Sequence, residues 1–280
     1  MPNTTINSSP GEPGCVHVCR FAGYDVSLPP LLEAAGLRQA LAGARRILIK
    51  PNLVQTDPPP ITTPVEHIAV LIDYIREFSD LPITVGDGTG SLYHETDRCF
   101  EELGYVEMAR EKGVELLDLN QAPSVRLCRP ELQRFPEIFL PAIAMESFVI
   151  SVPMLKAHTL AGVTLSMKNM IGLAPPAHYQ QSGSWKKAAF HQRIQEAIAD
   201  LNRHRTPDFT ILDATIGMPE AHIYGPSCDP PINRLAAGSD PVAMDAFGTA
   251  LLQKKWQHIG HIADVHGELG YAEPLEIIEE

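Results

Sequence analysis

The chain has 280 residues, of which 44% are hydrophobic and 20% are charged, as is usual for a globular protein. Its net charge is −12, with 34 acidic side chains against 22 Lys and Arg. An acidic chain repels phosphate backbones at long range, so we expect no nucleic-acid partner.

The five cysteines are widely spaced and include no Cys-x-x-Cys pair. This spacing favours reduced thiols over a disulfide framework and indicates a cytoplasmic protein. Residues 1–14 are polar and rich in Asn, Ser, Pro and Gly, which predicts a disordered leader rather than a signal peptide. The longest apolar run, residues 139–155, contains Glu146 and two prolines, so we expect no membrane partner.

From residue 15 onward, apolar runs of strand length alternate with amphipathic stretches of helix length. Strands are predicted at residues 16–21, 45–50, 83–85, 114–118, 148–152, 209–212 and 235–237. Helices are predicted at residues 31–42, 63–78, 95–103, 105–112, 187–203 and from 240 onward, with a hairpin or irregular segment at 120–142. The alternation indicates one α/β domain over residues 15–280, with a mainly parallel sheet and helices on both faces.

The helix at residues 63–78 has a recognisable start. Thr63 is placed to cap it, Pro64 suits the first helical position, and Glu66 completes a capping box.

Ligands of an open parallel sheet bind beside the carboxyl ends of its strands. Polar side chains follow five of the predicted strands, so we expect them to form one site. Those with the clearest chemistry are Lys50, Asn52, Asp87, Thr89, Lys156, His158 and Asp213.

The loop after the strand at 83–85 carries glycines at alternate positions, Gly86, Gly88 and Gly90. Such a loop lets backbone N–H groups approach an oxyanion, and together with Thr89 it predicts substrate binding. A tight turn with no ligand explains the glycines equally well. The loop is not a P-loop, because no Gly-Lys-Ser/Thr sequence closes it.

Two lysines and a histidine are the candidate catalytic residues. Lys156 is expected to clamp a carboxylate or phosphate, or to act as a base or nucleophile if burial lowers its pKa. His158 is the candidate general acid/base, because a histidine titrates near neutral pH. Lys168 and Asn169 interrupt the apolar run 162–172, so they need a buried partner, either a ligand or a carboxylate.

Lys50, Asn52 and Asn169 are predicted to bind the substrate. Asp87 and Asp213 are candidates to orient His158 or to bind a divalent metal, although the identity of any cofactor stays open.

Other polar side chains are weaker candidates. Asp240 is expected to cap a helix, and Asp245, one turn later, is a site candidate if it faces inward. His178 and His191 flank the Ser/Gly-containing stretch 180–184, a candidate lid over the site, but a lone histidine is more often structural.

Six short sequences occur in one order along the chain: Lys50-Pro51-Asn52-Leu53-Val54, Gly86-Asp87-Gly88, Lys156-Ala157-His158, Lys168-Asn169-Met170-Ile171-Gly172, Asp213-Ala214 and Gly238-Ser239-Asp240-Pro241-Val242-Ala243. Together they resemble domain-of-unknown-function family 362 over roughly residues 45–250. The resemblance implies that the matched residues form the polar centre of that family. Members often carry a ferredoxin-like module and are labelled iron–sulfur or redox proteins. This chain has no Cys-x-x-Cys-x-x-Cys sequence, so we expect no intrinsic iron–sulfur cluster.

Three functions follow from these observations. The first is an enzyme that acts on a small carboxylate or phosphate metabolite at a Lys/His/Asp site. The second is an electron-transfer protein whose iron–sulfur cluster sits on a redox partner. The third is a non-catalytic binding or assembly protein, for instance a homo-oligomer.

Overall fold

The computed structural model describes residues 14–181 and 185–280. The expected leader lies outside these residues, apart from Gly14, which begins the first strand. Among the described residues, no helix combines the length and the apolar character needed to cross a membrane.

In the described part of the chain, ten strands form one sheet, in the order β12-β1-β11-β10-β7-β2-β3-β4, with β8 and β9 joined at β10. Strands β7, β2, β3 and β4 pair in parallel, as do β10 with β7 and β8, and β1 with β12. Antiparallel pairs are β1–β11, β10–β11 and β8–β9. The predicted mainly parallel α/β fold is therefore confirmed. The strands are β1 Gly14–Arg20, β2 Ile47–Lys50, β3 Ile83–Asp87, β4 Glu115–Asp118, β7 Phe148–Ser151, β8 Met154–His158, β9 Gly162–Thr164, β10 Phe209–Met218, β11 Arg234–Gly238 and β12 Leu275–Glu279.

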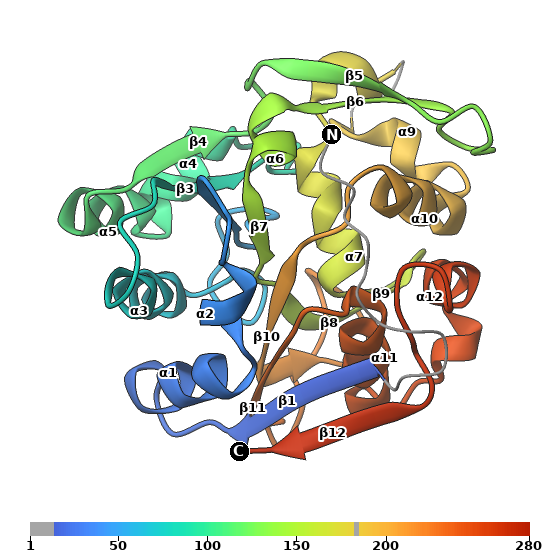
Figure 1. Cartoon of the computed structure of the whole chain (residues 1–280). Helices are drawn as coiled ribbons and strands as arrows, with labels where there is room; N and C mark the ends of the chain where they lie inside the picture. Colours follow the sequence, from blue (N-terminus) through green and yellow to red (C-terminus); the bar gives the residue numbers. More distant parts are fainter. Residues whose placement is uncertain (1–13, 182–184) are drawn as a thin grey trace.

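Helices cover both faces of this sheet (Figure 1). One face carries α1 Tyr24–Ala34, α3 Val65–Arg76 and α5 Tyr105–Lys112. The other carries α7 Ser166–Asn169, α10 Ile194–His204, α11 Pro241–Leu251 and α12 Gly260–Val265. The remaining elements are α2 Leu37–Ala40, α4 Thr96–Glu102, the hairpin β5 Ser124–Cys128 and β6 Glu137–Pro141, α6 Ala142–Glu146, the 3-10 helices Met170–Leu173 and Trp256–His258, α8 Pro176–Tyr179 and α9 Ala188–His191.

The central strands are apolar on both faces because both faces are covered. In β2, Ile47 and Ile49 belong to the hydrophobic core on the α1/α3 side, whereas Leu48 belongs to a core on the other side. This alternation follows the period of two of a strand. It explains why the sequence of β2 shows an unbroken apolar run.

Three predicted elements differ in the structure. The helix expected at 31–42 is divided into α1 and α2 at Gly36, whose φ of 75° is in the left-handed region. The helix expected at 187–203 is divided into α9 and α10 at Arg193, which has a φ of 52°. The capping box at Thr63 does not form. Its hydroxyl instead donates to the Val152 carbonyl at 2.9 Å, so it joins the end of β7 to the start of α3.

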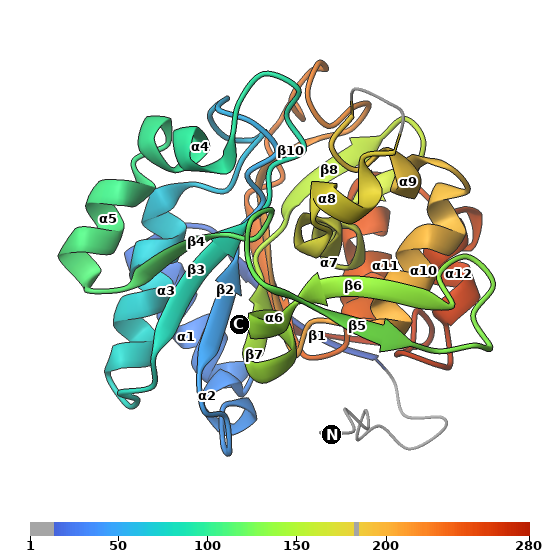
Figure 2. The same cartoon turned by 90° about the horizontal axis from the view of Figure 1, so that it is seen from above.

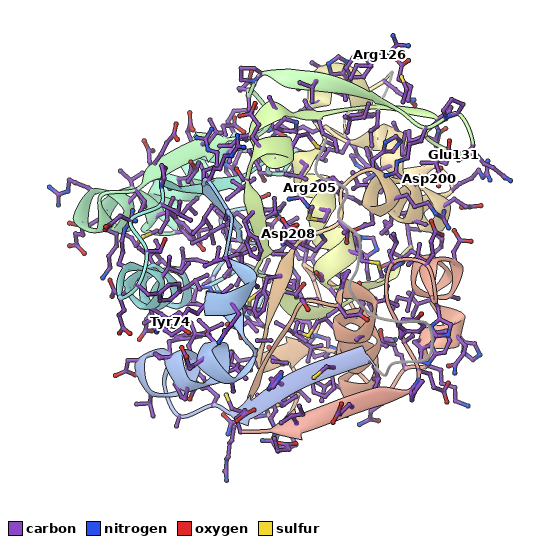
Figure 3. The ribbon with its side chains drawn as sticks, in the orientation of Figure 1. Tyr74, Arg126, Glu131, Asp200, Arg205 and Asp208 are labelled. Atoms are coloured by element: carbon purple, nitrogen blue, oxygen red, sulfur yellow. The ribbon has the colours of Figure 1, made fainter. Side chains whose placement is uncertain are left out.

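Arg205 and Asp208 lie together at the amino ends of β7 and β10 (Figure 3). The Arg205 guanidinium donates to the carbonyls of Ala144 and Ser147 at 2.8 and 2.9 Å and to the Asp208 carboxylate. Asp208 in turn accepts the Val149 N–H at 2.7 Å. These bonds hold the loop before β7 and the loop before β10 together, a structural role.

Candidate functional site

A buried polar network lies at the carboxyl ends of β2, β3 and β8. It contains two lysines, two asparagines and one aspartate from four separate segments, Lys50, Asn52, Asp87, Lys156 and Asn169. Loops from distant parts of the chain surround this edge, at the top of Figure 2. The structure therefore brings together five of the side chains that the sequence predicts to share a site.

Lys50 is the fully buried centre of this network. Its ammonium donates to Asp87 Oδ1 at 2.7 Å, to Asn169 Oδ1 at 3.1 Å and to the Pro51 carbonyl at 3.1 Å. Burial lowers the pKa of Lys50, and the charge of Asp87 opposes this shift. All three N–H donors of an ammonium are used, so Lys50 has none left for direct contact with a substrate.

Both carboxylate oxygens of Asp87 also accept hydrogen bonds within the protein. Its Oδ1 accepts from Lys50 and from the Gly88 N–H at 2.7 Å, and its Oδ2 accepts the Leu53 N–H at 2.6 Å. The carboxylate therefore fixes the loop after β2 and the loop after β3 to one another.

Two asparagines connect this pair to Lys156. Asn169 Oδ1 accepts from Asn52 Nδ2 at 3.2 Å, and Asn169 Nδ2 donates to the Lys50 carbonyl at 3.2 Å and to Ser151 Oγ at 3.1 Å. Asn52 Oδ1 accepts from Lys156 Nζ at 2.5 Å. The two amides are thus fixed in orientation by the network.

Lys156 is buried without a carboxylate partner in the described part of the chain. Its Nζ donates only to Asn52 Oδ1 and to the Ile61 carbonyl, at 2.6 Å. Burial, and then the charge of Lys168, holds the pKa of Lys156 well below its ordinary value. A lowered pKa favours the neutral amine, which retains a lone pair when its two hydrogens are donated, and this favours a role as base or nucleophile.

Lys168, on the short helix α7, differs from the other lysines. Its side chain is partly exposed, and among residues 14–181 and 185–280 it has no hydrogen-bond or ion-pair partner. Loss of hydration, and then the charge of Lys50, lowers the pKa of Lys168 to about 8. Its charge also lowers the pKa of four histidines, which are His158, His191, His222 and His261.

His158, at the end of β8, is held in one tautomer. Its Nδ1 accepts the backbone N–H groups of Leu160 and Ala161, both at 3.1 Å, so the ring proton resides on Nε2. Burial, followed by the charge of Lys168, lowers the pKa of His158. At neutral pH the ring is therefore an uncharged N–H donor.

Three further residues belong to this region, and only Gly172 lies in one of the short sequences that predicted it. His222 stacks on His158 with ring centroids 4.1 Å apart, and burial lowers its pKa to about 3. The Lys187 Nζ donates to the carbonyls of Ile171 and Gly172, and burial lowers its pKa to about 7. Gly172 lies directly on the Lys50–Asp87 pair, so that an added Cβ would be 2.4 Å from Lys50 Nζ. Only Gly172 had a sequence signal, because it ends the sequence Lys168-Asn169-Met170-Ile171-Gly172.

Asp213 does not join the network. It lies within β10, which extends beyond the predicted end at residue 212, rather than at the end of a strand. Its Oδ2 accepts from Tyr24 OH at 2.6 Å and from His67 Nδ1 at 3.1 Å, while Oδ1 binds Thr215. The expected orientation of His158 by Asp213 is therefore not seen, and the aspartate orients His67 instead.

Asp87 and Asp213, the predicted metal ligands, have separate sets of partners. In the part of the chain that the structure describes, no group of three or more His, Cys, Asp or Glu side chains is arranged to hold a metal ion. We therefore assign no metal role to either aspartate.

In the glycine loop after β3, backbone N–H groups donate to side chains of the protein instead of pointing toward a ligand. The N–H groups of Gly88, Thr89 and Ser91 donate to the side chains of Asp87, Thr96 and Thr89. A Cβ on Gly88 would be 2.5 Å from the Gly172 carbonyl, so this glycine allows two loops to approach. Gly86 lies in β3, where an added Cβ would be 3.2 Å from atoms of Leu117 and Leu48. These contacts favour the tight-turn alternative over an anion cradle.

The weaker candidates divide between the site and the scaffold. Residues 182–184 of the candidate lid lie outside the described part of the chain. We refer to Lys168, Lys187, His158 and His222 together as the basic region. His191 belongs to this region, because its Nδ1 contacts the Lys187 carbonyl at 3.2 Å. His178 stacks on Phe139, away from it. Asp240 caps α11 through the N–H groups of residues 242 and 243, as predicted. Asp245 is buried and accepts the N–H groups of Ser166 and Met167 at 2.7 and 3.2 Å, so it holds the start of α7.

The comparisons with known proteins support the resemblance that the six short sequences indicate. The family model "Domain of unknown function (DUF362)" matches residues 47–250. The chain belongs to this family. It is also similar to the "Thylakoid-associated protein sll1697" of Synechocystis sp., with 26% identity over 236 residues, which cover 81% of this chain and 69% of the relative. The matched residues of the DUF362 chain include all five members of the buried network.

Proposed function

We propose that this DUF362 protein is an enzyme that binds a small carboxylate or phosphate metabolite beside Lys168. The observation that supports this proposal is the unpartnered Lys168 ammonium among neutral histidines. A cation that has lost part of its hydration needs a compensating anion or a network of acceptors. No described side chain supplies either one, so the ammonium is open to an anion from solution.

The buried network positions this cation. Asn169 is the next residue to Lys168 and is bonded to Lys50, Asn52 and Ser151. The helix α7 is therefore fixed at one end by these bonds and at the other by Asp245. Such preorganised charge stabilises an anion, or charge that develops during a reaction, without rearrangement.

His158 and Lys156 are the proposed chemical groups. The His158 Nε2–H is a donor next to the proposed anion, and anion binding would raise the pKa of this ring toward the range of a general acid/base. Lys156, a buried amine with neutral acceptors, is the second candidate for proton transfer. The reaction that these groups perform remains unassigned, and the free cysteines favour a cytoplasmic location.

The proposal is tested with inorganic phosphate and acetate, by calorimetry and by the thermal shift that each ligand produces. Lys168→Met should weaken the binding of the preferred anion by roughly tenfold or more, because a charge-assisted contact is lost. Lys254→Met, at an exposed lysine, is the matched control and should leave binding unchanged. Equal binding by wild type and Lys168→Met, or no binding of either anion by wild type, would contradict the proposal.

A second measurement tests the catalytic part. Mass spectrometry of small molecules that copurify with wild type, but not with Lys168→Met, identifies the candidate substrate. We expect His158→Gln to retain the bound anion and lose its conversion. A metabolite that wild type binds and never converts would favour the non-catalytic alternative.

A further inference from the structure

The basic region around Lys168 is lined by aromatic rings. His158 stacks on His222 at 4.1 Å with an interplanar angle of 25°, and Trp185 contacts His191 with ring centroids 4.6 Å apart. Lys187, two residues after Trp185, donates to the carbonyls of Ile171 and Gly172, so the segment of Trp185 packs against the chain just after Lys168. The charge of Lys168 also lowers the pKa of His158, His191 and His222. A ligand at Lys168 therefore meets π-faces as well as donors.

Large apolar side chains are exposed on the same loops. Leu160, two residues after His158, is 51% exposed, and Trp185 is 47% exposed. Tyr224, two residues after His222, is 85% exposed. Trp185 thus contacts a histidine of the site directly, and Leu160 and Tyr224 each lie two residues from one in the sequence.

A fourth loop adds to this set. Lys186 Nζ donates to the His94 carbonyl at 2.7 Å, which joins the segment of Trp185 to the loop after β3. That loop carries Tyr93, which is 84% exposed. In the described part of the chain, the exposed large aromatic side chains are Tyr93, Trp185 and Tyr224, and all three belong to these loops. Figure 2 shows the loops after β3 and β10 and the segment before α9 along the same edge of the molecule.

We infer that the anion bound beside Lys168 carries an aromatic group, which stacks on Trp185. This inference rests on the proposed function, because it names the substrate class of the same site. Apolar side chains that gather at one edge mark a binding surface, whereas single exposed ones do not. An aromatic carboxylate or aromatic phosphate satisfies both features, with its anionic group at Lys168 and its ring at the exposed indole.

A bilayer surface is the other occupant that an aromatic rim could suit. The net charge of −12 opposes approach to an anionic membrane. Two of the four lysines in this region are also recessed, since Lys156 and Lys187 are 0% and 4% exposed. They cannot form the flat polybasic surface that binds lipid head groups, so the observations favour a small molecule.

The test compares phenyl phosphate with inorganic phosphate by calorimetry. We expect wild type to bind phenyl phosphate roughly tenfold more tightly than phosphate, the increment typical of one aromatic stack. Trp185→Leu should remove this difference and leave phosphate binding unchanged, while Trp185→Phe should retain most of it. Trp256→Phe, at the second tryptophan of the chain, is the matched control.

Each outcome separates the two proposals. Equal affinity for both probes, or an unchanged preference in Trp185→Leu, overturns the aromatic assignment and leaves anion binding intact. Failure of both probes to bind, or unchanged binding in Lys168→Met, overturns the proposed function itself. Sedimentation of wild type, but not of Trp185→Leu, with phosphatidylglycerol vesicles would overturn the small-molecule assignment in favour of a membrane surface.

Discussion

The substitution Asp87→Asn isolates the central ion pair of the network. Asparagine keeps the shape of the side chain but removes the charge that faces Lys50 Nζ at 2.7 Å. Both side chains are almost completely buried, with 1% of Lys50 and 4% of Asp87 exposed. The substitution therefore leaves an ammonium in a low-dielectric site with only neutral oxygen acceptors.

The expected loss of stability follows from that burial. Removal of one partner of a buried ion pair typically costs about 3–5 kcal/mol, because the other charge stays uncompensated. The unfolding entropy is roughly 2.1 cal/mol/K per residue, or about 0.6 kcal/mol/K for 280 residues. The two values together predict a decrease in Tm of about 5–9 °C.

Differential scanning calorimetry measures this decrease, with Asp73→Asn as the matched control. Asp73 forms the same kind of contact with Lys112 at 2.6 Å, but 58% of its side chain is exposed. An exposed pair contributes about 0–1 kcal/mol, so the control should shift Tm by at most about 2 °C. The double variant Lys50→Met/Asp87→Asn should be more stable than Asp87→Asn alone, because the stranded charge is gone. Equal shifts for Asp87→Asn and Asp73→Asn would refute the buried pair.

Two further predictions concern the same site. Gly172→Ala should destabilise the protein by about 1–3 kcal/mol in chemical denaturation, since the new Cβ would be 2.2 Å from Asp87 Oδ1. Gly90→Ala, with no atom within 4 Å of its Cβ, is the control, and equal effects would contradict the close approach. Binding of acetate, whose charge is constant above pH 6, should weaken above pH 8, because the pKa of Lys168 is about 8 and only the protonated amine attracts an anion. The loss should reach about tenfold per pH unit and be absent in Lys168→Arg, which stays charged; a flat profile in wild type would refute the assignment.

Much of the fold could be predicted from local patterns. An unbroken apolar run such as that of β2 indicates a strand buried on both faces, and polar residues at its end indicate the edge where ligands bind. The strand β8 was missed, because Lys156 and His158 make its sequence resemble a polar loop. Its burial depends on the acceptors Asn52 and Ile61, which are 104 and 95 residues away in the sequence. Such long-range partners leave no local pattern.

The position of Asp213 shows a second limit of end-of-strand reasoning. Side chains in a strand alternate between faces, so Asp213 shares the face of Ile211. Ile211 belongs to the core beneath α1 and α3, and these helices supply Tyr24 and His67 to the aspartate. The sequence identified a polar residue near the correct edge. The alternation of side chains between the two faces of β10, rather than the position of the strand end, determines the partners of Asp213.

Buried cations have opposite roles at the amino ends and at the carboxyl ends of the strands. Near the start of β7, Arg205 is bonded to several carbonyls and to a carboxylate, so its charge is compensated within the fold. Near the end of β8, Lys156 has only neutral acceptors and Lys168 has no described partner. The charge of Lys168 lowers the pKa of Lys156, and the charge of Lys50 lowers the pKa of Lys168. Such repulsion between neighbouring cations reduces the stability of the free protein. The anion proposed to bind beside Lys168 would recover that cost, and for this reason we propose that function lies at the carboxyl ends of the strands and structural support at their amino ends.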